Sequence, residues 1–328
     1  MVSRYLVTGG CGSVGSALVE KLLKEGNTVC SLDINENGLF LQSQMLSNIY
    51  PNKYKPFIGD IRDFQRILKA MNNVEYVYHC AALKHVKLSE YNPFEAIKTN
   101  VDGTNNVLNA AISCDIKAVV VTSSDKAVNP SSTMGATKLL AERVSIDANS
   151  SVGNNKIKIS VVRFGNIWNS AGSVGPIFKS QCLDNKDITL TSKDMTRFFI
   201  TMEKSLQLCE FAMKNMVGGE IFIANMGTLN ICDLANSFIN YYSSKSNIKL
   251  IGIQPGEKLY EELYTEQEAT RVGSYDGYLI VLPENIYLNK CINFWKNNPK
   301  FNFLEGKSAL VSDQKVNLID PINLVKNI

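Results

Sequence analysis

Residues that bind metals are scarce in this sequence. Only two histidines occur among 328 residues, and none of the eight cysteines belongs to a C-x-x-C pair. Structural zinc sites need about four such ligands at close spacing. We therefore expect no metal site, and we interpret the cysteines as buried thiols of a protein in a reducing compartment.

Long apolar runs and a strong excess of one charge are also absent. No run approaches the roughly 20 apolar residues that cross a bilayer, and glycines follow the first residues too soon for a signal peptide. The formal net charge of +3 is too small to predict binding to nucleic acid. We expect a cytoplasmic protein with neither a membrane nor a nucleic acid as a partner.

Up to about residue 165, the sequence alternates short β-branched segments with segments of helical period. This alternation is typical of βαβ units and predicts an α/β fold with a doubly wound, parallel Rossmann sheet. A helix is expected over residues 16–25, where Gly26 stops it. The strands are expected at residues 5–8, 28–32, 54–58, 76–80, 118–123 and 159–164.

The second half of the sequence has a weaker hydrophobic periodicity. A strand is expected over residues 220–224 and a helix over 231–242, whereas the tail from about residue 299 has no clear period and is expected to be poorly ordered. We divide the chain into a nucleotide-binding Rossmann domain at residues 1–165 and a smaller α/β substrate-binding domain at residues 166–328. The second domain is expected to be partly interleaved with the first.

A glycine-rich loop, TGGCGSVG, joins the first expected strand to the first expected helix. Gly9 permits a tight turn, Gly12 lets the backbone approach a pyrophosphate, and Gly15 lets the helix pack against the strand. Surface turns can also produce spaced glycines, but here they follow a strand and open a helix. The loop residues expected to contact a dinucleotide are Thr8, Gly9, Gly12, Ser13, Val14 and Gly15.

An acidic residue, Asp33, ends the second expected strand. A carboxylate there can accept hydrogen bonds from both hydroxyls of an adenosine ribose, although Asp33 could also be a turn residue. NAD is favoured over its 2′-phosphate, because Asp33 would repel that phosphate and no arginine follows at residues 34–37. Asp60 and Ile61 follow the third strand and are expected near the adenine, although Asp60 could equally cap a helix.

Several motifs occur in order over roughly residues 4 to 265: TGGCGSVG, GDIRD, CAALKHV, NPFEAIKTNVDGT, SSDKAVNP, MGATK, VVRFGN, DMTRFF and IQPGEK. Together they resemble the extended short-chain dehydrogenase/reductase superfamily, and within it the polysaccharide-biosynthesis branch of UDP-N-acetylglucosamine 4,6-dehydratases. SSDKAVNP and IQPGEK are the strings most specific to that branch. The resemblance implies an NAD-dependent enzyme and a homo-oligomer, with the helices around residues 94–111 and 136–148 at the interface.

The resemblance also implies a reaction in three steps. A hydride leaves carbon 4 of the sugar of UDP-N-acetylglucosamine or a related nucleotide sugar. Water is then lost across carbons 5 and 6, and the hydride returns to carbon 6. The cofactor is regenerated in each turnover, so it can stay bound.

The adjacent residues Asp125 and Lys126, in SSDKAVNP, would supply an acid and a base for the loss of water. The resemblance makes Asp125 the acid that protonates the departing hydroxyl and Lys126 the base at carbon 5, which requires a lowered pKa for Lys126. Ser124 is expected to hydrogen-bond the 4-hydroxyl, whose proton leaves through Asp125 or water. A surface salt pair after a strand is the alternative.

Most members of the superfamily carry a Tyr-x-x-x-Lys pair whose tyrosinate acts as a base. Met134 and Lys138 stand at these positions here. Methionine cannot ionise, so Met134 cannot be that base. Lys138 is still expected to bond the nicotinamide ribose. Met134 fits a subgroup of the branch, and it also fits plain helix packing.

Further residues of these motifs complete the expected site. The resemblance assigns to the cofactor Ala81, Ala82, Lys84 and Asn100. It assigns to the nucleotide sugar Lys84, His85, Asn166, Arg197, Glu257 and Lys258. Arg197 and the Glu257–Lys258 pair resemble a diphosphate clamp, since a guanidinium can bond two phosphate groups. Each could instead be an ordinary exposed charge or structural residue.

Three other functions account for part of the sequence. A nucleotide-sugar 4-epimerase would use the same cofactor loop, but it normally depends on the missing tyrosine and has no use for Asp125 and Lys126. A reductase would exchange its cofactor and leaves the same pair unexplained. A non-catalytic NAD-binding sensor would account for the missing tyrosine.

Overall fold

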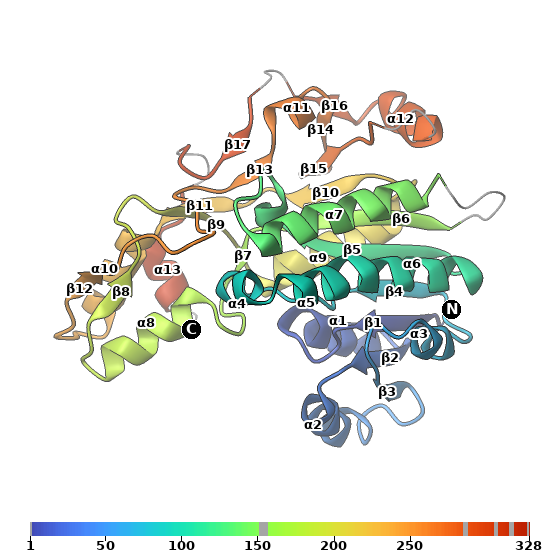
Figure 1. The fold of residues 1–328 in the computed structure, drawn as a ribbon, viewed down its shortest axis with the longest axis horizontal. Helices are drawn as coiled ribbons and strands as arrows, with labels where there is room; N and C mark the ends of the chain where they lie inside the picture. Colours follow the sequence, from blue (N-terminus) through green and yellow to red (C-terminus); the bar gives the residue numbers. More distant parts are fainter. Residues whose placement is uncertain (1, 151–156, 285–287, 305–307, 315–317, 327) are drawn as a thin grey trace.

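The computed structural model describes residues 2–150, 157–284, 288–304, 308–314, 318–326 and 328 (Figure 1). Strands of the first half form the middle of one large sheet. They are β1 (Arg4–Thr8), β2 (Thr28–Asp33), β3 (Tyr54–Ile58), β4 (Tyr76–His79), β5 (Ala118–Ser124) and β6 (Lys158–Phe164). They lie parallel in the order β3-β2-β1-β4-β5-β6. The predicted doubly wound, parallel Rossmann sheet is confirmed.

The central strands read as nearly continuous apolar segments because both faces of the sheet are covered. In β5, every residue from Ala118 to Ser123 is buried. Figure 1 shows helices on both faces. The helices of the first half are α1 (Ser13–Lys24), α2 (Glu36–Leu46), α3 (Phe64–Ala70), α4 (Val86–Tyr91), α5 (Pro93–Ile97), α6 (Gly103–Ser113) and α7 (Thr133–Ala148). Two short turns join them, the π-helical η1 (Lys98–Asp102) and the 3-10 helical η2 (Asp125–Ala127).

The second half of the chain extends the same sheet. Strand β10 (Ile221–Ala224) pairs parallel with β6, and the antiparallel strands β15 (Tyr278–Val281), β14 (Val272–Tyr275) and β16 (Asn302–Phe303) follow outward. Helices α9 (Met202–Asn215), α11 (Glu266–Ala269) and α12 (Asn289–Lys296) accompany them. Strand β10 thus continues the parallel part of the sheet, while the division into two partly interleaved domains stays a prediction.

A smaller lobe lies at the left of Figure 1 and has its own core. Its aromatic centre is Trp168, Phe178, Phe199 and Phe238, which are in ring contact. Its strands are β7 (Asn166–Ile167), β8 (Ile188–Leu190), β9 (Thr196–Ile200), β11 (Gly227–Asn230) and β12 (Ile248–Leu250). Its helices are α8 (Val174–Leu183) and α10 (Ile231–Tyr241).

The tail beyond residue 299 contains regular elements, in addition to β16. Strand β17 (Leu310–Val311) pairs with β13 (Glu262–Tyr264), and helix α13 (Pro321–Val325) packs on α10. The expectation of a poorly ordered tail is wrong for these residues. Their partners lie far away in the sequence, so local periodicity could not reveal them.

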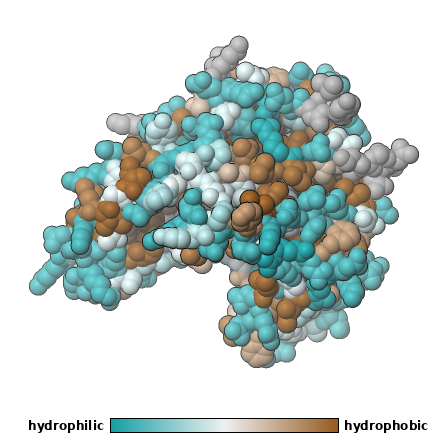
Figure 2. Space-filling view, viewed as in Figure 1, coloured by the Kyte–Doolittle hydropathy of each residue, from teal (hydrophilic) through white to brown (hydrophobic). Residues whose placement is uncertain are grey.

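Apolar side chains gather near the centre of the face shown in Figure 2, over α4, α5 and α7. Exposed apolar side chains on these three helices include Leu88, Phe94, Ile97 and Leu140. Phe94, Ile97 and Leu140 lie in the segments that the sequence assigns to an oligomer interface, and Leu88 lies outside them. That interface remains a prediction. Among the described helices, none has both the length and the apolar composition of a membrane span.

Candidate active site

A cavity of about 750 Å³ opens where β1, β4, β5 and β6 end. The strand order reverses between β1 and β4, and open α/β sheets bind their ligands beside such a reversal. The predicted site residues that line this cavity are Gly9, Gly12, Ser13, Val14, Gly15, Ala82, Lys84, His85, Ser124, Lys126, Met134, Lys138, Asn166, Arg197, Glu257 and Lys258. Those outside its lining are Thr8, Asp33, Asp60, Ile61, Ala81, Asn100 and Asp125.

The glycine loop has no room for a side chain at two of its glycines. Gly9 has φ +67°, and a Cβ there would lie 2.6 Å from the nitrogen of Ala81. A Cβ on Gly15 would lie 2.1 Å from the carbonyl oxygen of Gly9. Helix α1 begins at Ser13 with no acidic side chain in its first turn. Its free N–H groups therefore suit a pyrophosphate.

Asp33 lies beside this loop and is already hydrogen-bonded to it. One carboxylate oxygen accepts from the backbone N–H of Cys11 at 2.9 Å, and the other accepts from the N–H of Asn35 at 2.9 Å. Each oxygen keeps a second lone pair. Asp33 thus fixes the loop to the end of β2, and its contact with a ribose stays a prediction.

Asp60 and Ile61 have structural partners. The carboxylate of Asp60 accepts from Nη2 of Arg62 at 2.6 Å, and this bond holds the pKa of Asp60 below its usual value. Ile61 is buried against Gly103, where a Cβ would lie 2.7 Å from its Cδ1. Neither residue lines the cavity, so a contact of Asp60 or Ile61 with adenine stays a prediction.

Asn100 and Thr8 are buried behind the cavity. In the π-helical turn η1, Asn100 bonds both backbone groups of Leu83 at 2.8 and 3.0 Å, and donates to Oγ1 of Thr137 at 2.9 Å. Asn100 therefore ties the segment after β4 to α7 through Thr137, the residue before Lys138. Thr8 Oγ1 bonds Nδ1 of His79 at 2.7 Å, and burial lowers the pKa of His79 to about 3, so this histidine is neutral.

The pair Asp125–Lys126 lies at the end of β5, where η2 begins. Ser124 Oγ donates to Oδ1 of Asp125 at 3.0 Å and accepts from the backbone N–H of Lys126 at 3.0 Å. Lys126 Nζ donates to the same Oδ1 at 3.0 Å. Asp125 is 0% exposed, whereas Lys126 lines the cavity. The alternative of a surface salt pair is therefore wrong.

The pKa of Lys126 is shifted in the direction opposite to the expectation. Burial alone would lower its pKa, but the carboxylates of Asp125 and Glu261 outweigh burial and raise it, while Arg197 opposes them. The predicted fall in the pKa of Lys126 is therefore wrong for this state of the protein. The physical reason is the pair of carboxylates, Asp125 first and Glu261 second, and Glu261 is not among the residues that the sequence predicted.

Glu261 is a site residue that sequence reasoning missed. Its Oε1 lies 3.5 Å from Nζ of Lys126 and 3.8 Å from Nε of Arg197, and its side chain is 4% exposed. Glu261 lines the cavity. It follows IQPGEK closely, but nothing in the local sequence separates it from its neighbour Glu262, whose side chain instead bonds Asn129.

Met134 and Lys138 lie one helical turn apart on α7, and both line the cavity. Lys138 Nζ donates to the carbonyl oxygen of Thr122 at 2.9 Å. Burial lowers the pKa of Lys138 to about 8, although Cys80 and Glu142 oppose this shift. Lys138 is therefore a cation that loses its proton more easily than an ordinary lysine.

Arg197, Glu257 and Lys258 hold the segment before β13 in place. Arg197 donates to backbone carbonyls, among them that of Lys258 at 2.8 Å. Lys258 Nζ donates to the carbonyl of Val128 at 2.8 Å, and Glu257 accepts from the N–H of Gln254 at 3.1 Å. The two cations can attract a diphosphate, whereas the carboxylate of Glu257 would repel one. A clamp of all three residues stays a prediction.

A strap of residues 170–173 crosses the cavity between the glycine loop and the segment after β4. The N–H of Ala171 donates to Oγ of Ser13 at 3.1 Å, and its carbonyl accepts from Nζ of Lys84 at 2.6 Å. Burial lowers the pKa of Lys84. His85 lies close to the strap at Gly172, and Asn166 lines the same cavity from β7.

A profile of the polysaccharide biosynthesis protein family matches residues 5–283. The chain belongs to this family. It is 44% identical over 307 residues to an uncharacterised membrane protein of Methanocaldococcus jannaschii, covering 91% of each. It is 35% identical over 309 residues to a UDP-N-acetylglucosamine 4,6-dehydratase (inverting) of Campylobacter jejuni, covering 94% of this chain and 90% of the relative. It is 36% identical over 306 residues to a UDP-glucose 4-epimerase of Rickettsia rickettsii, covering 93% and 90%.

Two solved structures resemble this chain over nearly its whole length. Pen from Bacillus thuringiensis superposes with a TM-score of 0.90 at 35% identity, covering 100% of this chain and 97% of Pen. DesIV, a dTDP-glucose 4,6-dehydratase from Streptomyces venezuelae with NAD and TYD bound, has a TM-score of 0.73 at 20% identity, covering 90% and 97%. The predicted polysaccharide-biosynthesis branch is confirmed at the level of the family, and the methionine subgroup stays a prediction.

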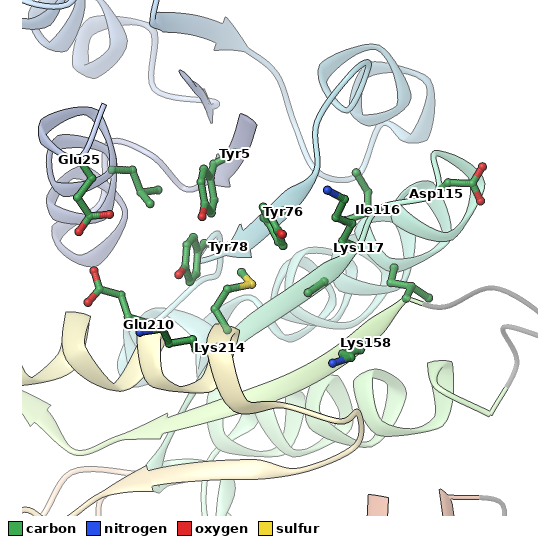
Figure 3. A pocket seen from close by; sticks show the side chains of 14 residues that line it. Tyr5, Glu25, Tyr76, Tyr78, Asp115, Ile116, Lys117, Lys158, Glu210 and Lys214 are labelled. Atoms are coloured by element: carbon green, nitrogen blue, oxygen red, sulfur yellow. The ribbon is translucent and has the colours of Figure 1, made fainter. Parts of the chain in front are cut away.

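A second cavity, of about 930 Å³, lies at the opposite, amino-terminal edge of the sheet (Figure 3). Its wall carries the stacked rings of Tyr5, Tyr76 and Tyr78, with centroids 5.2 and 6.0 Å apart for the pairs that include Tyr5. Its lining contains neither the glycine loop nor η2. We therefore assign the chemistry of this family member to the cavity that holds Lys126.

Proposed function

We propose that the protein is an NAD-dependent nucleotide-sugar 4,6-dehydratase that acts on UDP-N-acetylglucosamine or a related N-acetylated sugar. The observation that carries this proposal is the buried carboxylate of Asp125 paired with the amine of Lys126, which lines the glycine-loop cavity. Oxidation at carbon 4 alone needs no such pair. Loss of water from neighbouring carbons needs both an acid and a base.

NAD fits the residues of the glycine-loop cavity. The helix terminus at Ser13 would hold the pyrophosphate, Asp33 the adenosine ribose and Lys138 the nicotinamide ribose. The close backbone packing at Gly9 and Gly15 holds the loop against the start of α1 and the segment after β4, which supports a preformed site for the pyrophosphate. When bound, NAD supplies a hydride acceptor at carbon 4 and a hydride donor at carbon 6.

Ser124 and Asp125 handle the proton of the 4-hydroxyl. Ser124 lines the cavity and bonds Oδ1 of Asp125, so the buried carboxylate reaches the sugar through this hydroxyl. Asp125 receives the proton as carbon 4 is oxidised and returns it to the hydroxyl that leaves carbon 6. This transfer does not require Met134 to ionise.

Lys126 takes the proton from carbon 5. Its Nζ is anchored on the buried Asp125, while the side chain faces the cavity. Arg197 and Lys258 attract the diphosphate, and Lys84, His85 and Asn166 contact the sugar or its phosphates. The apolar faces of α5 and α7 form a homo-oligomer.

A nucleotide-sugar 4-epimerase is the second candidate, because relatives of similar identity carry that name. The product separates the two functions. The protein is incubated with UDP-N-acetylglucosamine, and the sugar is identified by NMR and mass spectrometry. A 4-keto-6-deoxy sugar without net NADH supports the dehydratase. A fully hydroxylated epimer supports the second candidate, and an unchanged sugar with tightly bound NAD indicates a sensor.

A further inference from the structure

The mechanism above leaves one buried carboxylate of the cavity unused. Glu261 faces Nζ of Lys126 through Oε1 at 3.5 Å. Its other oxygen, Oε2, is buried and has no hydrogen-bond partner among the described residues. A buried carboxylate with an unused oxygen is unfavourable unless the protein gains something from it.

The position of Glu261 is fixed by a distant part of the chain. Its backbone N–H donates to Oγ of Ser312 at 2.9 Å, and its carbonyl accepts from the N–H of Ser312 at 2.9 Å. Ser312 Oγ is in turn bonded to the carbonyl of Thr196 at 3.1 Å. Glu261 is therefore held toward Lys126 by the strand β9 and by the residue that follows β17.

The charges around Lys126 raise a difficulty for its role as a base. Asp125, Glu261 and Arg197 face Lys126, and the two carboxylates keep it an ammonium ion. An ammonium ion cannot take the proton from carbon 5. Its own proton must first move, either to solvent or to a neighbouring carboxylate.

Of the two carboxylates, Glu261 is the better acceptor for this proton. Oδ2 of Asp125 is also buried without a hydrogen-bond partner among the described residues, but Oδ1 accepts from both Ser124 and Lys126. In the proposed mechanism Asp125 already carries the proton of the 4-hydroxyl when carbon 5 is deprotonated, and it lies outside the lining of the cavity. Around Glu261, burial and Asp125 raise the pKa, while Lys126, Arg197 and Lys258 oppose the rise, and the net shift is upward. Glu261 thus binds a proton more readily than an exposed glutamate.

We propose that Glu261 accepts the ammonium proton of Lys126, so that Lys126 meets carbon 5 as a neutral amine. This inference rests on the proposed dehydratase function. Glu261 is a positioning residue, because it acts through Lys126. The protons balance without an outside acid or base: Lys126 gives one to Glu261, takes the proton of carbon 5, returns it to carbon 5 when the hydride arrives at carbon 6, and recovers its own from Glu261.

The test is Glu261→Gln, which keeps the size of the side chain but cannot accept the proton. At neutral pH, exchange of the carbon 5 hydrogen with deuterated solvent should fall by about 100-fold. The rate should recover as pH rises, because solvent then removes the proton from Lys126, whereas the wild-type rate should be flat over the same range. Hydride transfer from carbon 4, followed by the absorbance of NADH, should be unchanged.

A purely electrostatic or structural role predicts something different. Removing the negative charge of Glu261 would make Lys126 easier to deprotonate, so a purely electrostatic Glu261 gives a faster variant. A faster Gln variant, or one with the wild-type rate and pH profile, overturns the proposal. Glu261→Asp retains a proton acceptor and should show the flat wild-type profile at a reduced rate. Glu266→Gln, an exposed glutamate in the first turn of α11, is the matched control and should behave as wild type.

Thermal unfolding and NAD binding first establish that each variant folds. If Glu261→Gln does not fold, infrared difference spectra of the wild-type protein give the answer. Addition of substrate should produce the bands of two protonated buried carboxyls, those of Asp125 and Glu261, and a single band overturns the proposal. Failure of the dehydratase function itself is distinguishable, since the wild-type protein would then form no 4-keto-6-deoxy sugar.

Discussion

The glycine loop and the surroundings of Lys126 occupy one cavity but are built in different ways. The loop is a steric device made largely from residues 8–15, with Cys80 and Ala81, which follow β4, as its close neighbours. The surroundings of Lys126 are an electrostatic device whose members Asp125, Arg197 and Glu261 come from three separate segments. We therefore expect binding of the cofactor to be sensitive to local shape, and the chemistry to be sensitive to distant contacts.

The sharpest test of this division is Lys126→Ala. The rate at which water is eliminated should fall by about 10²-fold to 10⁴-fold, because the base at carbon 5 is gone. NAD should still bind. The measurements are formation of the 4-keto-6-deoxy sugar and quenching of protein fluorescence by NAD. Lys117→Ala, at the amino end of β5, removes an exposed lysine paired with Glu75 and serves as the control. Unchanged turnover of Lys126→Ala would remove Lys126 from the mechanism.

Gly15→Ala tests the other half of the comparison. The new Cβ would meet the carbonyl oxygen of Gly9 at 2.1 Å, so the loop or α1 must shift. We expect NAD affinity to fall by at least about tenfold and the free energy of unfolding to fall by about 1–3 kcal/mol. Gly59→Ala is the matched control, since its Cβ meets only side-chain atoms that can move. Equal NAD affinity in both variants would contradict a steric role for Gly15.

These two devices also explain what could be predicted from the sequence. The positive φ of Gly9 and the contact of Gly15 with Gly9 lie within the loop, so the spacing and the flanking strand and helix were enough to predict it, whereas the contact of Gly9 with Ala81 appears only in the fold. The parallel sheet followed from the apolar strands in the same way. Asp125 and Lys126 were found through a motif, because their adjacency in the sequence is also their adjacency in space.

Glu261 could not be found in this way, because its contact with Lys126 exists only after the chain has folded. Asp125 and Glu261 together raise the pKa of Lys126, opposite to the predicted direction, and the share of Glu261 in this effect depends on that folded contact. The tail was missed for the same reason, since β17 gains its pairing from β13. Ser312 shows the link between these errors, because this tail residue holds the backbone of Glu261.

A smaller effect is expected from Ser312→Ala, which tests whether a distant residue supports the chemistry. The variant leaves the N–H of Glu261 without its acceptor and loosens the position of that carboxylate. We expect the elimination rate to fall by about threefold to tenfold and NAD affinity to stay the same. Ser113→Ala, at the exposed end of α6, is the control for loss of a hydroxyl. A parallel fall in NAD affinity would mean that the two devices are not separate.

The smallest expected effect concerns Lys138, a charged residue that lines the cavity and is expected to contact the cofactor. Its pKa is about 8 in the folded protein, below the 10.5 of an ordinary lysine. Between these two pH values the unfolded chain binds more protons than the folded one, so stability contributed through Lys138 rises with pH there. Below about pH 8 the buried charge remains as a destabilising feature.

Lys138→Met should therefore raise the melting temperature at pH 7, and this advantage should shrink as pH rises from about 8 toward 10.5. Thermal unfolding of both proteins across this range measures the difference. An advantage that stayed constant with pH would show that packing of the methionine, rather than loss of the charge, stabilises the variant.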